Sequence, residues 1–145
     1  YGQNQTQSTK QSDNNFNADT ENTNKHILIV DDEPSISGLL KSILETQGYQ
    51  CKNFSSSRHA LKYFSDHPDE FNLIISDQTM PELTGFQLIT EIRKIRQNIA
   101  AIISTGYSEN FNESIASKNN IIFLPKPVGT ELLLNTVYKA LHISS

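Results

Sequence analysis

The sequence of 145 residues predicts an α/β fold built on one doubly wound parallel sheet. Five short runs of β-branched and aliphatic residues alternate with five longer segments whose apolar residues recur at helical spacing. The third run, Phe71–Ser76, is almost wholly apolar, as expected of a central strand that is covered on both faces. Alternating strands and helices of this kind imply right-handed crossovers between parallel strands.

The first strand is predicted over Lys25–Val30, and the first helix begins at Pro34, because proline pre-sets the first helical turn. Gly48 is expected to end this helix. Tyr49–Phe54 alternates polar with apolar residues, like a half-exposed edge strand. The residues that repeat at helical spacing and predict the first helix are Ile36, Leu39, Leu40, Ile43 and Leu44.

The serines of Ser55–Ser57 offer an N-cap for the second helix, and His67 and Pro68 close it. Its inner face is expected to consist of Ala60, Leu61 and Phe64. The central strand Phe71–Ser76 follows, and after a Met-Pro loop the third helix begins. The residues that mark this third helix are Phe86, Leu88, Ile89, Ile92 and Ile95.

The last three elements before the final helix are a strand over Ala100–Thr105, a weak helix roughly over Glu109–Ser117 and a strand over Ile121–Leu124. The final helix is predicted over Thr130–Leu141. Its inner face is expected to consist of Leu133, Leu134, Val137, Tyr138 and Leu141.

Two strands have the sequences of edge strands. The second strand alternates in polarity, and the fifth ends at Pro125, which has no N–H to donate to a neighbouring strand. In a flavodoxin-like sheet with the order 2-1-3-4-5, strands two and five are the edges. We therefore predict that order, with five helices.

Composition divides the chain into two parts. Residues 1–24 are nearly all Asn, Gln, Ser, Thr and acidic residues, which predicts a flexible polar linker or tail ahead of a domain over 25–145. The formal net charge is −4 and the basic residues are scattered, which argues against direct nucleic-acid binding. No apolar run approaches the ~18 residues of a membrane span, so we expect no membrane contact by this segment.

Cys51 is the only cysteine, so no internal disulfide can form. A cytoplasmic, reducing location fits this cysteine usage, although the parent protein could be membrane-anchored. We expect Cys51 to be a small buried apolar residue.

Four predicted strands end in polar side chains. Asp31 and Asp32 follow the first strand, Asp77 follows the third, Thr105 closes the fourth and Lys126 follows the fifth. Because ligands bind at the carboxyl ends of the strands in an open parallel sheet, these side chains are expected to surround one site.

The chemistry of this set points to phosphoryl transfer. Three adjacent carboxylates repel unless a cation joins them, and Mg²⁺ prefers carboxylate and phosphoryl oxygens. Lys126 can neutralise a phosphoryl group and Thr105 can donate a hydroxyl. Asp77 is the expected nucleophile, since aspartate can form an aspartyl phosphate. Phosphoryl transfer needs little beyond positioning and charge neutralisation, which this set supplies.

Four motifs occur in order between residue 25 and about residue 142: ILIVDDEP, SDQTMPELTG, IISTGYS and FLPKP. In this combination the chain resembles the receiver domain, the phosphoacceptor module of two-component response regulators and hybrid sensor kinases. The resemblance implies two-component signal transduction, in which a phosphoryl group passes from a phosphohistidine to an aspartate.

The resemblance also implies roles for individual residues. Asp77 matches the phosphorylated aspartate. The Mg²⁺ ligands would be the carboxylates of Asp31, Asp32 and Asp77 with the backbone carbonyl of Thr79. Lys126 matches the lysine that contacts the phosphoryl group, and family members often have a cis peptide bond before the following proline, here Pro127.

Thr105 and Phe123 match the switch residues of the family. The hydroxyl of Thr105 would move toward the phosphoryl group, and the fourth helix, fifth strand and fifth helix (the α4-β5-α5 face of the family) would change their packing. Core packing alone is the alternative role for Phe123. Gly106 fits a small-residue position that leaves the phosphate accessible, and Thr79 and Tyr107 occupy positions that tune dephosphorylation.

The implied partner is a histidine kinase or a histidine phosphotransfer domain, and a homodimer is a further candidate. His26, His59, His67 and His142 share no ligand spacing, so the phosphodonor histidine is expected elsewhere. The chain is then not a conventional enzyme, although it would catalyse its own phosphorylation and assist its own dephosphorylation.

Two other functions remain open from the sequence. A haloacid-dehalogenase-like phosphatase also uses a strand-end aspartate and Mg²⁺, but its nucleophile lies in an Asp-x-Asp motif, whereas Asp31 and Asp32 are adjacent. A receiver-like docking module that needs no phosphorylation is the second alternative. The start at Tyr1 and the polar leader favour a receiver cut from a hybrid histidine kinase over a stand-alone regulator.

Overall fold

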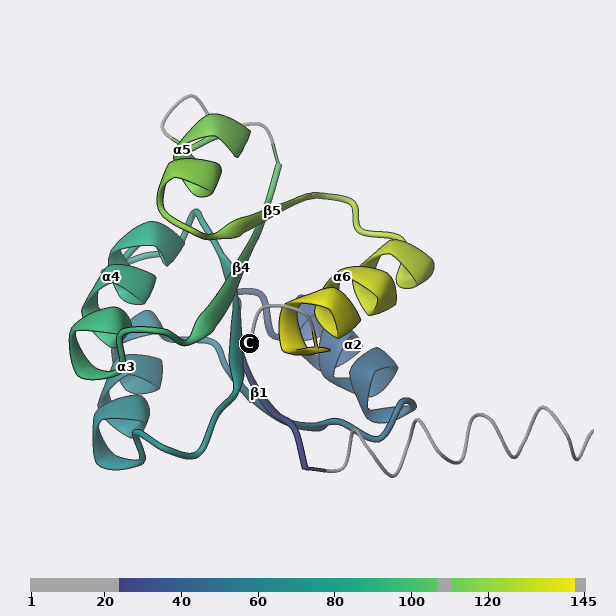
Figure 1. Cartoon of the computed structure of the whole chain (residues 1–145), viewed down its shortest axis with the longest axis horizontal. Coiled ribbons are helices and arrows are strands. Elements are labelled where there is room, and N and C mark those ends of the chain that lie inside the picture. The colour runs from purple at the N-terminus through teal and green to yellow at the C-terminus, as the bar shows by residue number, and fades with distance from the viewer. Residues whose placement is uncertain (1–23, 107–110, 143–145) are drawn as a thin grey trace, which may run out of the picture.

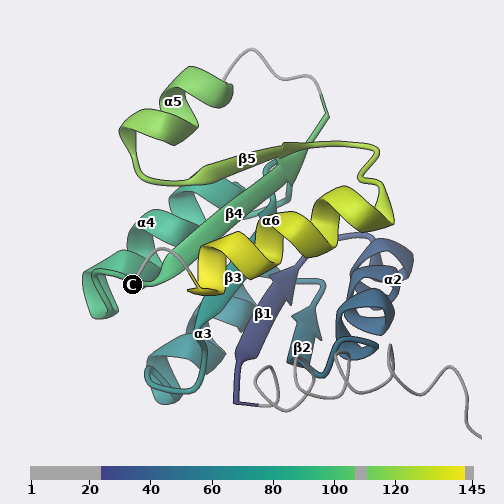
Figure 2. The same cartoon turned by 45° about the vertical axis from the view of Figure 1, so that its right-hand side comes forward.

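The computed structural model describes residues 24–106 and 111–142. These residues form a five-stranded parallel sheet with the order β2-β1-β3-β4-β5, as predicted. The strands are β1 (His26–Val30), β2 (Gln50–Phe54), β3 (Leu73–Asp77), β4 (Ala100–Thr105) and β5 (Ile122–Pro125). Figure 2 shows them side by side, with β2 and β5 at the two edges.

Five helices connect the strands: α2 (Pro34–Glu45), α3 (Ser57–Asp66), α4 (Gly85–Ile95), α5 (Glu113–Lys118) and α6 (Thr130–His142). Helices α3, α4 and α5 cover one face of the sheet, and α2 and α6 cover the other (Figure 1). The predicted fold class is therefore confirmed. No helix among the described residues is long and apolar enough to cross a membrane.

The side chains of each central strand alternate between two apolar cores. In β1, Leu28 and Val30 join the core under α3, α4 and α5, whereas Ile27 and Ile29 join the core under α2 and α6. All four are essentially inaccessible to solvent. Burial on both faces explains why the central strands read as continuous apolar runs.

Tyr138 is exposed, so the prediction that it faces inward is wrong, and two apolar residues of the other helical patterns, Leu39 and Ile95, are exposed as well. Leu39 is 58% exposed because it precedes the buried Leu40 by one residue and so projects about 100° away from it. Tyr138 follows the buried Val137 by one residue, so it also projects about 100° away from its buried neighbour, and it is 46% exposed. Ile95 ends α4, beyond the buried stripe of that helix, and is also exposed.

Several predicted boundaries also shift. The ladder of β3 begins at Leu73, not at Phe71; just before it, the N–H of His26 donates to the side chain of Asn72, and the carbonyl of His26 accepts from the N–H of Asn72. Helix α2 ends at Glu45, and Gly48, with φ 95°, ends the turn that follows. Because only glycine adopts such a φ readily, Gly48 marks the turn and not the last helical residue.

The predicted N-cap of α3 is confirmed. Ser56 is the N-cap of α3, and its side chain accepts from the N–H of His59. Helix α5 is shorter than expected and begins at Glu113. The predictions for residues 1–23, for Tyr107 and for the helix start at Glu109 lie outside the described residues.

Candidate functional site

The register of the sheet aligns the two acidic strand ends. Val30 of β1 pairs with Ser76 of β3, so Asp31 and Asp77 follow at the same level of adjacent strands. Asp77 in turn pairs with Ser104 of β4, which places Thr105 one residue beyond this level. The central position of β3 therefore brings Asp77 between the ends of β1 and β4.

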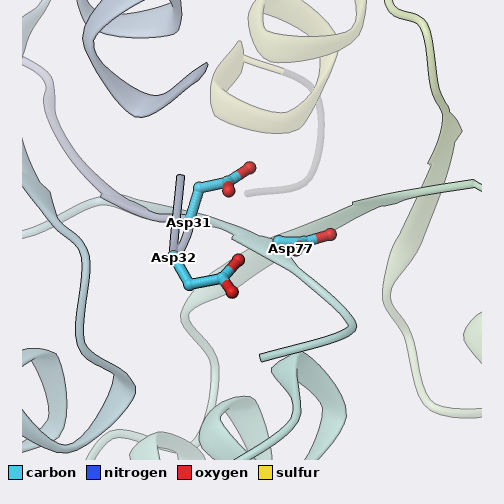
Figure 3. A group of neighbouring side chains, drawn as sticks. All are labelled: Asp31, Asp32 and Asp77. Carbon is cyan, nitrogen blue, oxygen red and sulfur yellow. The ribbon is translucent and has the colours of Figure 1, made fainter. Parts of the chain in front are cut away.

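The carboxylates of Asp31, Asp32 and Asp77 form one cluster, with their nearest ligand oxygens all within 4.8 Å of one another. The three side chains project from the adjacent ends of β1 and β3 (Figure 3). Asp31 and Asp77 are buried, whereas Asp32 is exposed and keeps the cluster open to solvent. This is the cluster of three carboxylates that the strand ends predicted.

Lys126 joins two of these carboxylates. Its Nζ lies 3.1 Å from Oδ2 of Asp31 and 3.3 Å from Oδ1 of Asp77. The other Asp31 oxygen, Oδ1, accepts from the N–H of Glu33, just before α2. One ammonium thus faces three carboxylates, which leaves the cluster with an excess of negative charge.

The main chain of β4 and β5 positions Lys126. Its N–H donates to the carbonyl of Thr105 over 2.9 Å, directly beyond the pairing of Thr105 with Pro125. The Lys126–Pro127 peptide bond is cis, as the resemblance implied. Edge-strand pairing therefore ends where the lysine turns toward the acidic cluster.

Burial raises the pKa of the Asp77 carboxyl above its usual value, and the neighbouring Lys126 ammonium offsets only part of this rise. The negative charge of Asp31 raises the pKa of Asp77 further. Burial alone would lower the pKa of Lys126, but Asp31 and Asp77 outweigh it, so this pKa lies above its usual range. Lys126 therefore carries its charge at neutral pH.

The two predicted switch residues lie on neighbouring strands. Thr105 is buried at the end of β4, and Phe123 is half-buried in β5, where it pairs with Ile103. The ring of Phe123 packs against Phe111 with centroids 6.2 Å apart, and Phe111 packs against Phe86 of α4 at 5.8 Å. Phe123 thus packs against the core under α3, α4 and α5, and a row of three rings joins β5 to the start of α4.

Two residues beside Asp77 were missed by the sequence analysis. A Cβ on Gly85 would overlap the carbonyl oxygen of Asp77, so only glycine lets α4 start this close to the strand end. Gln78 is buried and accepts twice: its carbonyl from the N–H of Gly85 and its Oε1 from the N–H of Phe86. Gly85 could have been singled out from the sequence, because it is a glycine at the start of a predicted helix. Nothing about the residue type of Gln78 indicated its role.

A comparison with known protein families matches residues 27–138 to the response regulator receiver domain. The chain therefore belongs to the receiver domain family of two-component signalling proteins.

Two curated relatives illustrate this membership. The chain is 31% identical over 121 residues to the transcriptional regulatory protein GlrR of Escherichia coli (strain K12), covering 83% of this chain and 27% of that protein. It is also 31% identical over 117 residues to the sensor kinase CckA of Brucella abortus (strain 2308), covering 80% of this chain and 12% of the kinase. The chain thus spans a minor part of the length of either relative.

A solved receiver structure has a similar fold. A response regulator receiver domain protein from Clostridium thermocellum superposes with a TM-score of 0.76 and 33% sequence identity, over 81% of this chain and 94% of that one. The family match and this superposition favour the receiver over the haloacid-dehalogenase alternative.

Proposed function

We propose that this chain accepts a phosphoryl group on Asp77 from a phosphohistidine of a histidine kinase or histidine phosphotransfer domain. The observation that carries the proposal is the contact of Lys126 with both Asp31 and Asp77 at the carboxyl end of the sheet. This arrangement places a nucleophilic carboxylate, a charge-neutralising ammonium and further carboxylates around one volume. Membership of the receiver family supports the same conclusion.

The donor set fits Mg²⁺. Three carboxylates against one ammonium leave negative charge for a divalent cation to neutralise, and all the nearby ligand atoms are hard oxygens. Asp31, Asp32 and Asp77 would hold the ion together with the backbone carbonyl of Thr79, an exposed residue two positions after Asp77. When bound, Mg²⁺ supplies positive charge against the phosphoryl oxygens and so favours transfer.

The transfer itself would be carried out by residues of this chain. A carboxylate oxygen of Asp77 attacks the phosphorus, the nitrogen–phosphorus bond of the phosphohistidine breaks, and the phosphoryl group ends on Asp77 as an acyl phosphate. The raised pKa of Asp77 makes this carboxylate more basic than an ordinary one. Lys126 leaves part of its interaction with Asp77 to contact the new phosphoryl oxygens.

We propose further that phosphorylation changes the packing of α5, β5 and α6. Thr105 would turn its hydroxyl toward the phosphoryl group, and the Phe123 ring would follow into the space this opens. The row Phe86–Phe111–Phe123 supports the idea, because a moved Phe123 must repack against Phe111 beside α5. Amide spectra with and without a phosphoryl mimic test it, and an unchanged α5-β5-α6 surface would contradict it.

The decisive experiment measures the intact mass of the chain after treatment with Mg²⁺ and acetyl phosphate. We expect a gain of one phosphoryl group that is absent without Mg²⁺ and absent from Asp77→Asn. A gain that persists in Asp77→Asn would place the acceptor elsewhere. No gain in the unaltered chain would favour the docking module that works without phosphorylation.

The wider setting stays a prediction. The domain limits of 25–145, the homodimer, the cytoplasmic location and the hybrid kinase as parent protein concern the whole gene product. Proteolysis and the full-length sequence would test the first and the last of these.

A further inference from the structure

The loop between β3 and α4, residues 78–84, contains a strained turn. The N–H of Leu83 donates to the carbonyl of Pro81 over 2.8 Å, and Glu82 between them has φ 73°. A three-residue turn with this hydrogen bond and a positive φ is a rare γ-turn. A glutamate in this conformation is costly, so the turn persists only if its surroundings stabilise it.

Ser57, the first residue of α3, bonds to both ends of this turn. Its hydroxyl donates to the carbonyl of Pro81 over 3.0 Å and accepts from the N–H of Leu83 over 3.1 Å. Ser57 is only 1% exposed, so water competes little for either bond. The hydroxyl of Ser56 adds a bond to the carboxylate of Glu82 over 3.3 Å. The first turn of α3 therefore holds the γ-turn in place.

Two further residues of the loop, Gln78 and Met80, anchor it. Gln78 accepts from the first two N–H groups of α4, over 3.0 Å at its carbonyl and 2.9 Å at its side chain. Met80 is buried in the core under α3 and α4. Thr79 lies between these anchors and is exposed. The position of the Thr79 carbonyl thus depends on contacts made on either side of it.

We propose that Ser57 is a positioning residue for the metal site: its hydroxyl holds the β3–α4 loop in the shape that presents the Thr79 carbonyl to a Mg²⁺ ion bound by Asp31, Asp32 and Asp77. The inference rests on the proposed function, since it assigns the same carbonyl to the metal. It adds a residue from α3, a helix that contributes none of the metal's own ligands. Ser57 acts only through the loop and touches no reacting atom.

The first test is the Mg²⁺ dissociation constant of Ser57→Ala, measured by isothermal titration calorimetry on the full chain. We expect this dissociation constant to rise roughly three- to tenfold, which corresponds to the loss of one or two net hydrogen bonds. Ser37→Ala is the matched control. Ser37 is also 1% exposed, and its hydroxyl donates to Pro34 and accepts from Asn53, away from the loop. The Mg²⁺ dissociation constant of Ser37→Ala should stay within about twofold of that of the unaltered chain.

The second test needs no metal. In the unaltered chain, the amide hydrogen of Leu83 should exchange slowly, because it is shared between Ser57 and Pro81. In Ser57→Ala it should exchange several times faster, while the amides of β3 stay protected. A Leu83 amide that exchanges as fast as an open loop in the unaltered chain would overturn the proposal, whether or not the variant folds.

The two tests separate this inference from the proposed function. If the unaltered chain shows no Mg²⁺ binding that Asp77→Asn abolishes, the proposed function fails, while Leu83 exchange still reports on the turn. If Mg²⁺ binds normally to both the unaltered chain and Ser57→Ala, the positioning role is wrong and the proposed function stands.

Discussion

At the scale of single residues, Asp77 works against the stability of the metal-free fold. Its carboxyl is buried in the neighbourhood of another carboxylate, and its pKa in the folded chain is raised above the usual 3.8. The folded chain therefore keeps this proton to a higher pH than the unfolded chain does. The contribution of Asp77 to the free energy of unfolding consequently falls as the pH rises from about 3.8 through the higher folded pKa.

Asp77→Asn removes this pH-dependent loss. We expect the metal-free variant to match the unaltered chain near pH 3 and to exceed its free energy of unfolding by about 1 kcal/mol at pH 7, measured by urea denaturation. Mg²⁺ should reverse the order, since a hundredfold excess over the dissociation constant adds about 2.7 kcal/mol to a chain that binds it. Asp69→Asn, at an exposed carboxylate, is the control. A variant less stable than the unaltered chain at pH 7 without Mg²⁺ would contradict the electrostatic account.

Cys51, in contrast, has a thiol that its burial makes chemically unreactive. Burial raises the pKa of its thiol to about 12, because the thiolate would be poorly solvated inside β2. We expect iodoacetamide to leave the folded chain unmodified at pH 8 and to label the urea-unfolded chain fully, as intact mass would report. Rapid labelling of the folded chain would mean that β2 opens readily.

At the scale of elements, the contact between β3 and the start of α4 decides where Asp77 lies. Gly85 allows the helix to approach the carbonyl of Asp77 more closely than any side chain would permit. The capping box of Thr84 and Gln87 then fixes the first turn of α4. The position of Asp77 therefore depends on the junction between β3 and α4 and not on β3 alone.

Gly85→Ala should therefore destabilise the fold by about 1–3 kcal/mol, because the new Cβ forces Asp77 and α4 apart. Gly38→Ala offers a matched control inside α2, where an added Cβ meets no atom within 4 Å. There alanine should stabilise the helix by about 0.5–1 kcal/mol. Urea denaturation of both variants gives the comparison, and equal effects at the two glycines would contradict the close approach.

At the scale of the whole molecule, the sheet and both apolar cores lie within residues 26–142. We expect deletion of residues 1–23 to change the free energy of unfolding by less than about 0.5 kcal/mol, because the deleted segment supplies almost no apolar surface. Phosphorylation at Asp77 should also persist in the shortened chain. A loss of either property would show that the polar leader belongs to the folded domain.

The sequence by itself determined the class of fold, the strand order and the polar residues that meet at the candidate site. These depend on local signals: the apolar period of a strand or helix, the missing N–H of Pro125, and polar residues such as Asp77 and Lys126 at strand ends. In a parallel sheet the carboxyl ends of all the strands lie on the same side of the molecule. Most of the polar residues that follow the strands therefore belong to the candidate site.

Only the tertiary structure decided which side chains meet. Leu39 and Tyr138 satisfy a helical period and are still exposed, because the width of the buried stripe depends on what packs against the helix. The hydrogen bonds between Ser57 and the β3–α4 loop, and between Gln78 and the first turn of α4, likewise join segments that no sequence period relates. The physical reason is that periodicity records which face of an element is apolar, whereas contacts between elements depend on backbone geometry that distant parts of the chain create together.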